Sequence, residues 1–204
     1  MVRGDLERAR ELVEASDEIH QRTADIWGRA QTIGTLGAIT RDEGDERSAL
    51  DLVRASAALA REAGSPWWES GALAEVACLS LNAGLVEEGE RRALESLAIA
   101  QQLRDRAARV FGVGLLARVA AERNQPERAG RLWGAIEDED AGAPLGGWRR
   151  HRATCEVRIR DAAGHEFDRG YADGCALTLD EAVVIALERD LGARSASTDR
   201  LGSS

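Results

Sequence analysis

The feature that most limits how this chain can fold is that it resembles itself after a shift of 40 residues. The segment GDLERARELVEAS at 4–16 aligns with GDERSALDLVRAS at 44–56, and the looser GLVEEGERRALES at 84–96 and NQPERAGRLWGAI at 124–136 follow at the same spacing. Apolar and small positions between these segments recur as well: Ile33, Leu73 and Val113; Gly34, Ala74 and Gly114; Leu36, Val76 and Leu116; Ile39, Leu79 and Val119. A helical hairpin cannot bury its apolar face alone, so this repeat predicts hairpins that stack on one another.

Start and stop signals recur with the same period and divide each repeat into two helices. Glycines that favour a left-handed C-cap recur at the junctions, two of them followed by an aspartate that can cap the next helix: Gly4 and Asp5, Gly44 and Asp45, and Gly84. Ser65 and Pro66 are typical of a helix start, with serine as N-cap and proline in the first turn. These signals and the apolar spacing predict helices near 5–20, 22–43, 45–63, 66–83, 86–103, 106–123 and 126–138.

The repeat pattern ends near residue 141, and a different set of helices follows. Helices are predicted near 148–163 and 165–173, and a final helix opens at TLDE, where Thr178 and Glu181 predict a capping box. We therefore expect an all-α, tetratricopeptide-like helical-hairpin solenoid with a helical cap and a small, polar, disordered tail. The expected boundaries are 1–141 for the repeats, 142–191 for the C-terminal cap and 192–204 for the tail.

Composition agrees with this class and limits the expected partners. The chain has three prolines, 44% apolar residues and abundant Ala, Leu, Glu and Arg, with no apolar runs of period two, which favours helices over strands. Its formal net charge of -9 opposes attraction to nucleic acid or to anionic lipid. We therefore expect no direct nucleic-acid binding.

Cysteine usage and the apolar profile predict a cytoplasmic chain. Cys78, Cys155 and Cys175 are widely spaced and form no CxxC pair, so neither a disulfide framework nor a zinc site is indicated. The first residues, MVRGDLERARELVEAS, are charged, and no stretch has the uninterrupted apolar length of a membrane span. We expect no membrane association, no metal and no cofactor.

The C-terminal third resembles a known group of regulators. The segments ERAGRLWGAIE, GAPL and GHEFDRGYADGCALTLDEAVVIALE resemble the C-terminal end of large bacterial, actinobacterial-type proteins: LuxR-like, adenylate-cyclase-like and signal-transduction ATPase regulators, in which a tetratricopeptide-like solenoid follows an NTPase module. The resemblance covers roughly residues 127–188. The closing pattern of the family, F-x-x-x-[WY]-x-x-G-x-x-L-[ST]-x-[DE]-[EQ]-A, is matched by Phe167, Tyr171, Gly174, Leu177, Thr178 and Glu181. The segment WRRHRATCEVRIR at 148–160 departs from the acidic, Ala-rich pattern that is usual in the family.

The resemblance implies a sensor or interaction segment, because the output modules of the family have no counterpart in these residues. The sequence contains no GxxxxGK[ST] phosphate loop, no cyclase aspartate pair and no helix-turn-helix after the solenoid. We therefore interpret the chain as a noncatalytic protein-interaction or effector-sensing solenoid of a bacterial signalling or transcription regulator. An upstream NTPase or cyclase domain of a parent protein is the partner that the resemblance implies.

Tryptophan gives the strongest indication of a binding surface. Trp27 and Trp67 align at the 40-residue period near the start of the first helix of each hairpin, which lines the concave groove in tetratricopeptide-like solenoids. A groove aromatic is a good anchor for a peptide or a flat ligand, although tryptophan is more often a core residue. With these two we name Gln31, Glu75 and Arg109 as candidate groove residues for a protein, a peptide or a small effector.

Other chemistry-bearing segments have simpler interpretations. The acidic run at 137–140 lacks EF-hand spacing and favours a solvated helix end. The segment GVGLLA at 112–117 lies within a predicted helix and does not follow a strand, so it indicates helix packing and not dinucleotide binding. The basic run at 149–152 indicates a solvated helix face. One alternative stays open, an enzyme with a small site assembled in the groove from dispersed residues such as Glu75, Arg109 and His151.

The N-terminal helix is expected to form an exposed edge of the array. The segment near 5–20 aligns with the second helix of a hairpin, and no first helix precedes it in the sequence. One side of the apolar stripe formed by Leu6, Ala9, Val13 and Ile19 would then lack its neighbour. We expect this edge to pair with another copy, giving a homodimer, or to dock onto an upstream domain.

Overall fold

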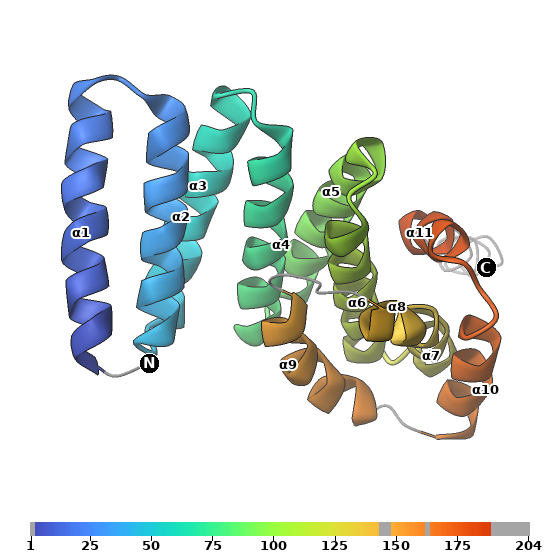
Figure 1. The fold of residues 1–204 in the computed structure, drawn as a ribbon. Coiled ribbons are helices and arrows are strands. Elements are labelled where there is room, and N and C mark those ends of the chain that lie inside the picture. The colour runs from blue at the N-terminus through green and yellow to red at the C-terminus, as the bar shows by residue number, and fades with distance from the viewer. Residues whose placement is uncertain (1–2, 143–147, 162–163, 189–204) are drawn as a thin grey trace, which may run out of the picture.

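The computed structural model describes residues 3–142, 148–161 and 164–188, so the expected tail at 192–204 lies outside the described residues. The described part is helical with no strands, which confirms the all-α prediction, and consecutive helices pack side by side from α1 to α7 (Figure 1). Within these ranges no helix has both the length and the apolarity that are needed to cross a bilayer. The helices are α1 (Arg3–Arg22), α2 (Ile26–Asp42), α3 (Glu46–Glu62), α4 (Pro66–Asn82), α5 (Val86–Leu103), α6 (Arg106–Glu122), α7 (Pro126–Gly134), α8 (Glu137–Gly142), α9 (Trp148–Arg160), α10 (His165–Gly174) and α11 (Leu179–Leu187).

Equivalent turns at a spacing of 20 residues make the array regular. The turns that precede α2 to α7 each contain one residue of positive φ, at Ala24, Gly44, Gly64, Gly84, Arg104 and Asn124. The N–H of the next residue then donates to the carbonyl oxygen five positions back, as from Asp45 to Thr40 at 3.1 Å, which is the Schellman geometry. Three of these positions, Ala24, Arg104 and Asn124, are not glycine. The glycines of the sequence therefore mark only some of the turns. The expectation for Gly4 was wrong, because this residue lies inside α1.

The positions that recur in the sequence form the interior of the array. Leu36, Val76 and Leu116 are all buried, as are the residues equivalent to Ile39. A buried serine also joins the two helices of a hairpin at equivalent places. Ser56 of α3 donates to the Ala30 carbonyl oxygen of α2 at 2.7 Å, and Ser96 of α5 donates to that of Ser70 in α4 at 2.8 Å. The repeat therefore keeps a polar contact as well as the apolar volume.

Two pairs of glycines bring the backbones of α7 and α10 together. A Cβ atom on Gly130 would lie 2.2 Å from the carbonyl oxygen of Phe167, and one on Gly170 would lie 2.1 Å from that of Glu127. No other residue leaves room for this approach. The second glycine of each helix is placed in the same way: Gly134 and Gly174. These two G-x-x-x-G segments hold the cap against the end of the repeats.

Helix α9 folds back onto the repeats and supplies the partner of a small residue. The buried ring of Trp148, at the start of α9, lies over Gly114 of α6, where a Cβ atom would come within 2.2 Å of it. Its ring centroid lies 5.6 Å from that of Phe111 and 5.9 Å from that of Trp133. Gly114 therefore has the packing role that the sequence favoured.

Helix α11 closes the cap and begins as predicted. The hydroxyl of Thr178 accepts from the Glu181 N–H at 3.3 Å, and the Glu181 carboxylate accepts from the Thr178 N–H at 2.8 Å, which completes the capping box. Arg109 of α6 forms an ion pair with Asp180. These contacts fix α11 against the last complete hairpin.

Two expectations for the end of the repeats were wrong. The helix expected over 126–138 ends at Gly134, and α8 begins separately at Glu137. Asp138 of α8 is exposed as expected, but Glu137 and Glu139 are not simply solvated. Glu137 pairs with Arg152 of α9 at 2.9 Å and Glu139 pairs with Arg106 of α6 at 2.6 Å. Both carboxylates are half-buried because α8 lies between these two helices.

Candidate ligand-binding pocket

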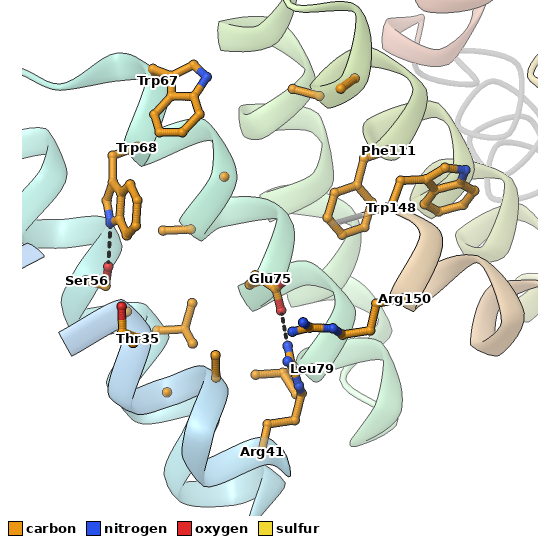
Figure 2. A pocket seen from close by; sticks show the side chains of 18 of the residues that line it. Thr35, Arg41, Ser56, Trp67, Trp68, Glu75, Leu79, Phe111, Trp148 and Arg150 are labelled. Atoms are coloured by element: carbon orange, nitrogen blue, oxygen red, sulfur yellow. Dashed lines mark hydrogen bonds and ion pairs between the residues drawn. The ribbon is translucent and has the colours of Figure 1, made fainter. Parts of the chain in front are cut away.

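A pocket with a cavity volume of about 500 Å³ lies where α2, α4 and α6 face the start of α9 (Figure 2). These first helices belong to three successive hairpins, so the repeat sets the spacing of three walls. The fourth wall comes from α9, which lies outside the repeat. The cap therefore completes a pocket whose other walls come from the array.

Aromatic rings form much of the wall. Trp67 and Trp68 begin α4, while Phe111 of α6 and Trp148 of α9 lie across the pocket from them (Figure 2). The indole N–H of Trp68 donates to the hydroxyl of Ser56 at 3.1 Å, which fixes the orientation of the ring. Aromatic walls that are already ordered bind flat apolar groups without a large further loss of side-chain entropy.

Three of the four charged residues that line the pocket gather at one end, and the fourth, Asp105, lies beside Trp67. Arg41 at the end of α2 and Arg150 of α9 both extend toward Glu75 of α4 (Figure 2). Arg41 donates to Oε2 of Glu75 at 2.8 Å and forms a second ion pair with Asp42 at 3.0 Å. Arg150 is exposed and makes no hydrogen bond or ion pair with another residue in the described part of the chain.

A buried histidine lies behind Glu75. Nε2 of His151 is 2.7 Å from Oε1 of Glu75, and Nδ1 is 3.2 Å from Sγ of Cys78. Burial alone would lower the pKa of His151, but the hydrogen bonds with Cys78 and Glu75 and the charge of Glu75 outweigh it and raise the pKa to about 9. Burial opposes the charged form of Glu75 too, but His151 and the two pocket arginines outweigh it, so the pKa of Glu75 is lowered. The pair is an imidazolium and a carboxylate at neutral pH.

The order Cys78, His151, Glu75 is also that of a nucleophile, a base and an orienting acid. Cys78 is only 1% exposed and does not line the pocket, so a molecule held there does not reach its Sγ atom. The contacts instead tie α9 to α4 beneath the pocket. Of the dispersed residues named for an enzyme site, Glu75 and His151 meet, whereas Arg109 turns toward α11.

The structure brings only some of the candidate groove residues together. Trp67 and Glu75 line the pocket. Trp27 and the half-buried Gln31 lie on α2 but do not line it, and Arg109 is engaged by α11. The periodicity of Trp27 and Trp67 led to one residue that lines the cavity, but it did not show where along the array the cavity lies.

The two aligned tryptophans have a structural contact in common. The indole N–H of Trp27 donates to the Ser65 hydroxyl at 3.3 Å, and that of Trp67 donates to a carboxylate oxygen of Asp105 at 3.1 Å. Ser65 and Asp105 are the N-cap residues of α4 and α6, so each indole connects one hairpin to the next. Both rings remain accessible, at 49% for Trp27 and 62% for Trp67. The hydrogen bond to Asp105 uses only the indole N–H of Trp67, so the face of the ring still lines the pocket.

Several pocket residues were missed by reasoning from the sequence. Trp68 has Gly28 and Ala108 at its equivalent positions, so the repeat gave no reason to select it. Arg150 belongs to the basic run that favoured a solvated face. Arg150 is indeed exposed, yet it lines the pocket, and its neighbour His151 is buried, which corrects that interpretation.

Comparison with known proteins found no matching protein-family model, no matching curated protein and no matching solved structure. Within the described residues, no group of three or more His, Cys, Asp or Glu side chains is placed to hold a metal ion. The interpretation of the pocket therefore depends on its own geometry and charge.

Proposed function

We propose that this chain is a noncatalytic, effector-sensing solenoid that binds a small molecule, or a side chain of a protein or peptide partner, in the pocket between α2, α4, α6 and α9. One observation carries the proposal: a cavity of about 500 Å³ with aromatic walls and with Arg41, Glu75 and Arg150 at one end. Small-molecule sites are typically of this size, mostly apolar, with a few polar groups that set orientation.

The cap favours a compact effector over a long peptide. Trp148 and Arg150 of α9 line the pocket beside α6. An extended peptide that followed the first helices of successive hairpins would meet α9 at this point. A small molecule or a single inserted side chain fits within the same boundaries.

The proposal places the chain in a bacterial signalling or transcription regulator with an NTPase or cyclase output domain upstream. The support is the resemblance of residues 127–188 to the C-terminal end of such proteins. In this setting, occupancy of the pocket would alter how α9 lies on α4 and α6. A change in the cap is then the signal that an output domain would detect.

We also propose that α1 mediates self-association. On this helix Leu12 is 57% exposed and Ile19 is 52% exposed, while Leu6, Ala9 and Val13 are half-buried. Ile19 therefore does not belong to the half-buried stripe in which the sequence placed it, and it lies with Leu12 on the exposed side. A second copy that covered it would remove apolar surface from water.

A thermal-shift screen of small aromatic and aliphatic metabolites tests the proposed function. Compounds that raise the melting temperature should bind Trp67→Ala more weakly by about 2 kcal/mol, as expected when a central aromatic anchor is removed. Trp27→Ala is the matched control, because it removes an equivalent indole contact outside the pocket. A library with no stabilising compound would contradict the proposal, and a compound converted to product would favour the enzyme alternative.

A further inference from the structure

We propose that the ligand of this pocket is an organic acid with a flat apolar body, whose anionic group binds between Arg41 and Arg150. This inference rests on the proposed function and names the chemical class of the effector. It follows from which polar groups in the pocket still have hydrogen-bonding capacity and which do not.

The Glu75 carboxylate is already engaged on both oxygens. Oε1 lies 2.7 Å from Nε2 of His151, and Oε2 accepts from Arg41 at 2.8 Å. A cationic ligand would have to compete with both of these partners for the carboxylate. The acceptor capacity at this end of the pocket is therefore largely used within the protein.

Donor capacity at the same end remains free. The guanidinium of Arg150 has no hydrogen-bonding or ion-pair partner within the described residues, although it lines the cavity. Arg41 is shared between Glu75 and Asp42 and retains N–H groups beyond those it donates there. A carboxylate is the acceptor that a planar guanidinium binds best, through two parallel hydrogen bonds.

The local charge favours an anion even though the whole chain is acidic. At the Glu75 end, Arg41, Arg150 and the protonated His151 face two carboxylates, Asp42 and Glu75, so one positive charge is in excess there, while the further lining carboxylate, Asp105, lies beside Trp67. The chain as a whole carries a formal net charge of -9. A local positive excess in such a protein attracts one small anion without making the surface attractive to polyanions.

The rest of the cavity fits a flat apolar body. Trp68 lies on one side and Phe111 on the other, with Trp148 beside it (Figure 2). Gly71 of α4 also lines the pocket, and a Cβ atom built there would meet nothing within 4 Å, so the cavity extends to the helix backbone. Ring systems stack on aromatic walls of this kind.

Calorimetric titration with acids and their neutral primary amides tests the inference. The probes are naphthalene-2-acetate, indole-3-acetate and octanoate, each paired with its amide. We expect at least one aromatic acid to bind about tenfold more tightly than its amide, with an affinity that falls as salt is added. The Arg150→Gln variant should lose about fivefold to tenfold in affinity for the acid and leave the amide unchanged.

Arg149→Gln is the matched control, because Arg149 is the exposed neighbour of Arg150 on α9 and does not line the pocket. It should retain the affinity of the wild type for the acid. Equal binding of acid and amide, or an Arg150→Gln variant with unchanged selectivity, would overturn the inference and leave the proposed function standing. If no acid or amide binds, the inference also fails, and the metabolite screen then decides the proposed function separately.

Discussion

Helices α1 and α6 occupy the same array but differ in how far they are enclosed. From Val110 to Ala120, every residue of α6 is buried. Among residues 5–22 of α1, whose exposure the structure describes, none is fully buried. Helix α6 packs against α5 and α7 in the array and against α9 and α11 in the cap, whereas α1 packs mainly on α2.

The difference shows that position in the array determines burial. A helix inside a solenoid is buried by neighbouring helices on both sides, whereas a helix at the end of the array has a neighbour on one side only. Here the cap adds a further layer over α6. The same layer forms the pocket, so the best-packed region of the molecule is also the region of the candidate site.

The largest expected effect is the difference in stability between a variant with a charge placed in α6 and a variant with the same charge placed in α1. Leu116→Asp buries an unpaired carboxylate at a position only 4% exposed, which costs several kcal/mol, about as much as the whole stability of a domain. Leu12→Asp should change the free energy of unfolding by less than about 1 kcal/mol. Urea unfolding followed by circular dichroism measures both. Similar losses in the two variants would contradict the contrast between the helices.

The next effect is a pH dependence that originates at the contact of α9 with α4. The pKa of His151 is raised to about 9, so its contribution to stability is complete below the ordinary value of 6.5 and is lost as the pH rises through 9. The loss can reach about 3 kcal/mol. Unfolding free energies measured between pH 6.5 and 9 should therefore fall in the wild type and stay nearly level in His151→Gln.

A second buried group limits the range that is useful for this test. Burial raises the pKa of Cys155 to about 11, so its effect on stability begins above pH 9. A slope between pH 6.5 and 9 that persists in His151→Gln would mean that the histidine is not the group responsible.

A smaller effect is expected from closing the space that admits Trp148. Gly114→Ala would place a methyl group against the ring and displace it, at a cost of about 1–3 kcal/mol. Gly71→Ala is the matched substitution on α4, where the space is open, and it should stabilise the helix by up to about 1 kcal/mol. Thermal unfolding of the two variants should shift in opposite directions. A Gly114→Ala variant that is as stable as Gly71→Ala would show that α9 does not depend on this contact.

The smallest effect on stability is expected at α1, where the substitutions should change assembly instead. Replacing Leu12 and Ile19 together by Glu should leave the unfolding free energy within about 1 kcal/mol of the wild type, because both side chains are more than half exposed. Light scattering after size exclusion should show a dimer for the wild type and a monomer for the double variant. A wild type that is monomeric at every accessible concentration would exclude this interface.

The array could be predicted from the sequence because its signals are local. Each turn carries its own cap and helix start, so the expected helix beginnings agree closely with the structure from α3 to α7. The end of α7 could not be predicted in this way. The sequence at this point carries no stop signal, and Gly134 packs against the backbone of Tyr171, which is distant in the sequence.

The pocket could be predicted only in part for the same reason. Trp67 was selected by its alignment with Trp27, whereas Glu75 has Thr35 and Leu115 at its equivalent positions, so the period did not select it. Trp148 and Arg150 lie on α9, which has no equivalent in the repeat, so self-alignment could not place them. The recurring small residue at Gly114 indicated that another side chain packs closely there, but the sequence did not identify that side chain as Trp148.

The tryptophans provide the most direct measurement of the central claim, that this pocket is a ligand site. Trp67, Trp68 and Trp148 line the pocket, whereas Trp27 and Trp133 do not. In a ¹⁵N-labelled sample, a compound that stabilises the protein in the metabolite screen should shift the indole N–H signals of the three lining residues and leave the other two in place, with each signal assigned from a Trp→Phe variant. Shifts confined to Trp27 or Trp133, or no shift at any indole, would contradict the account.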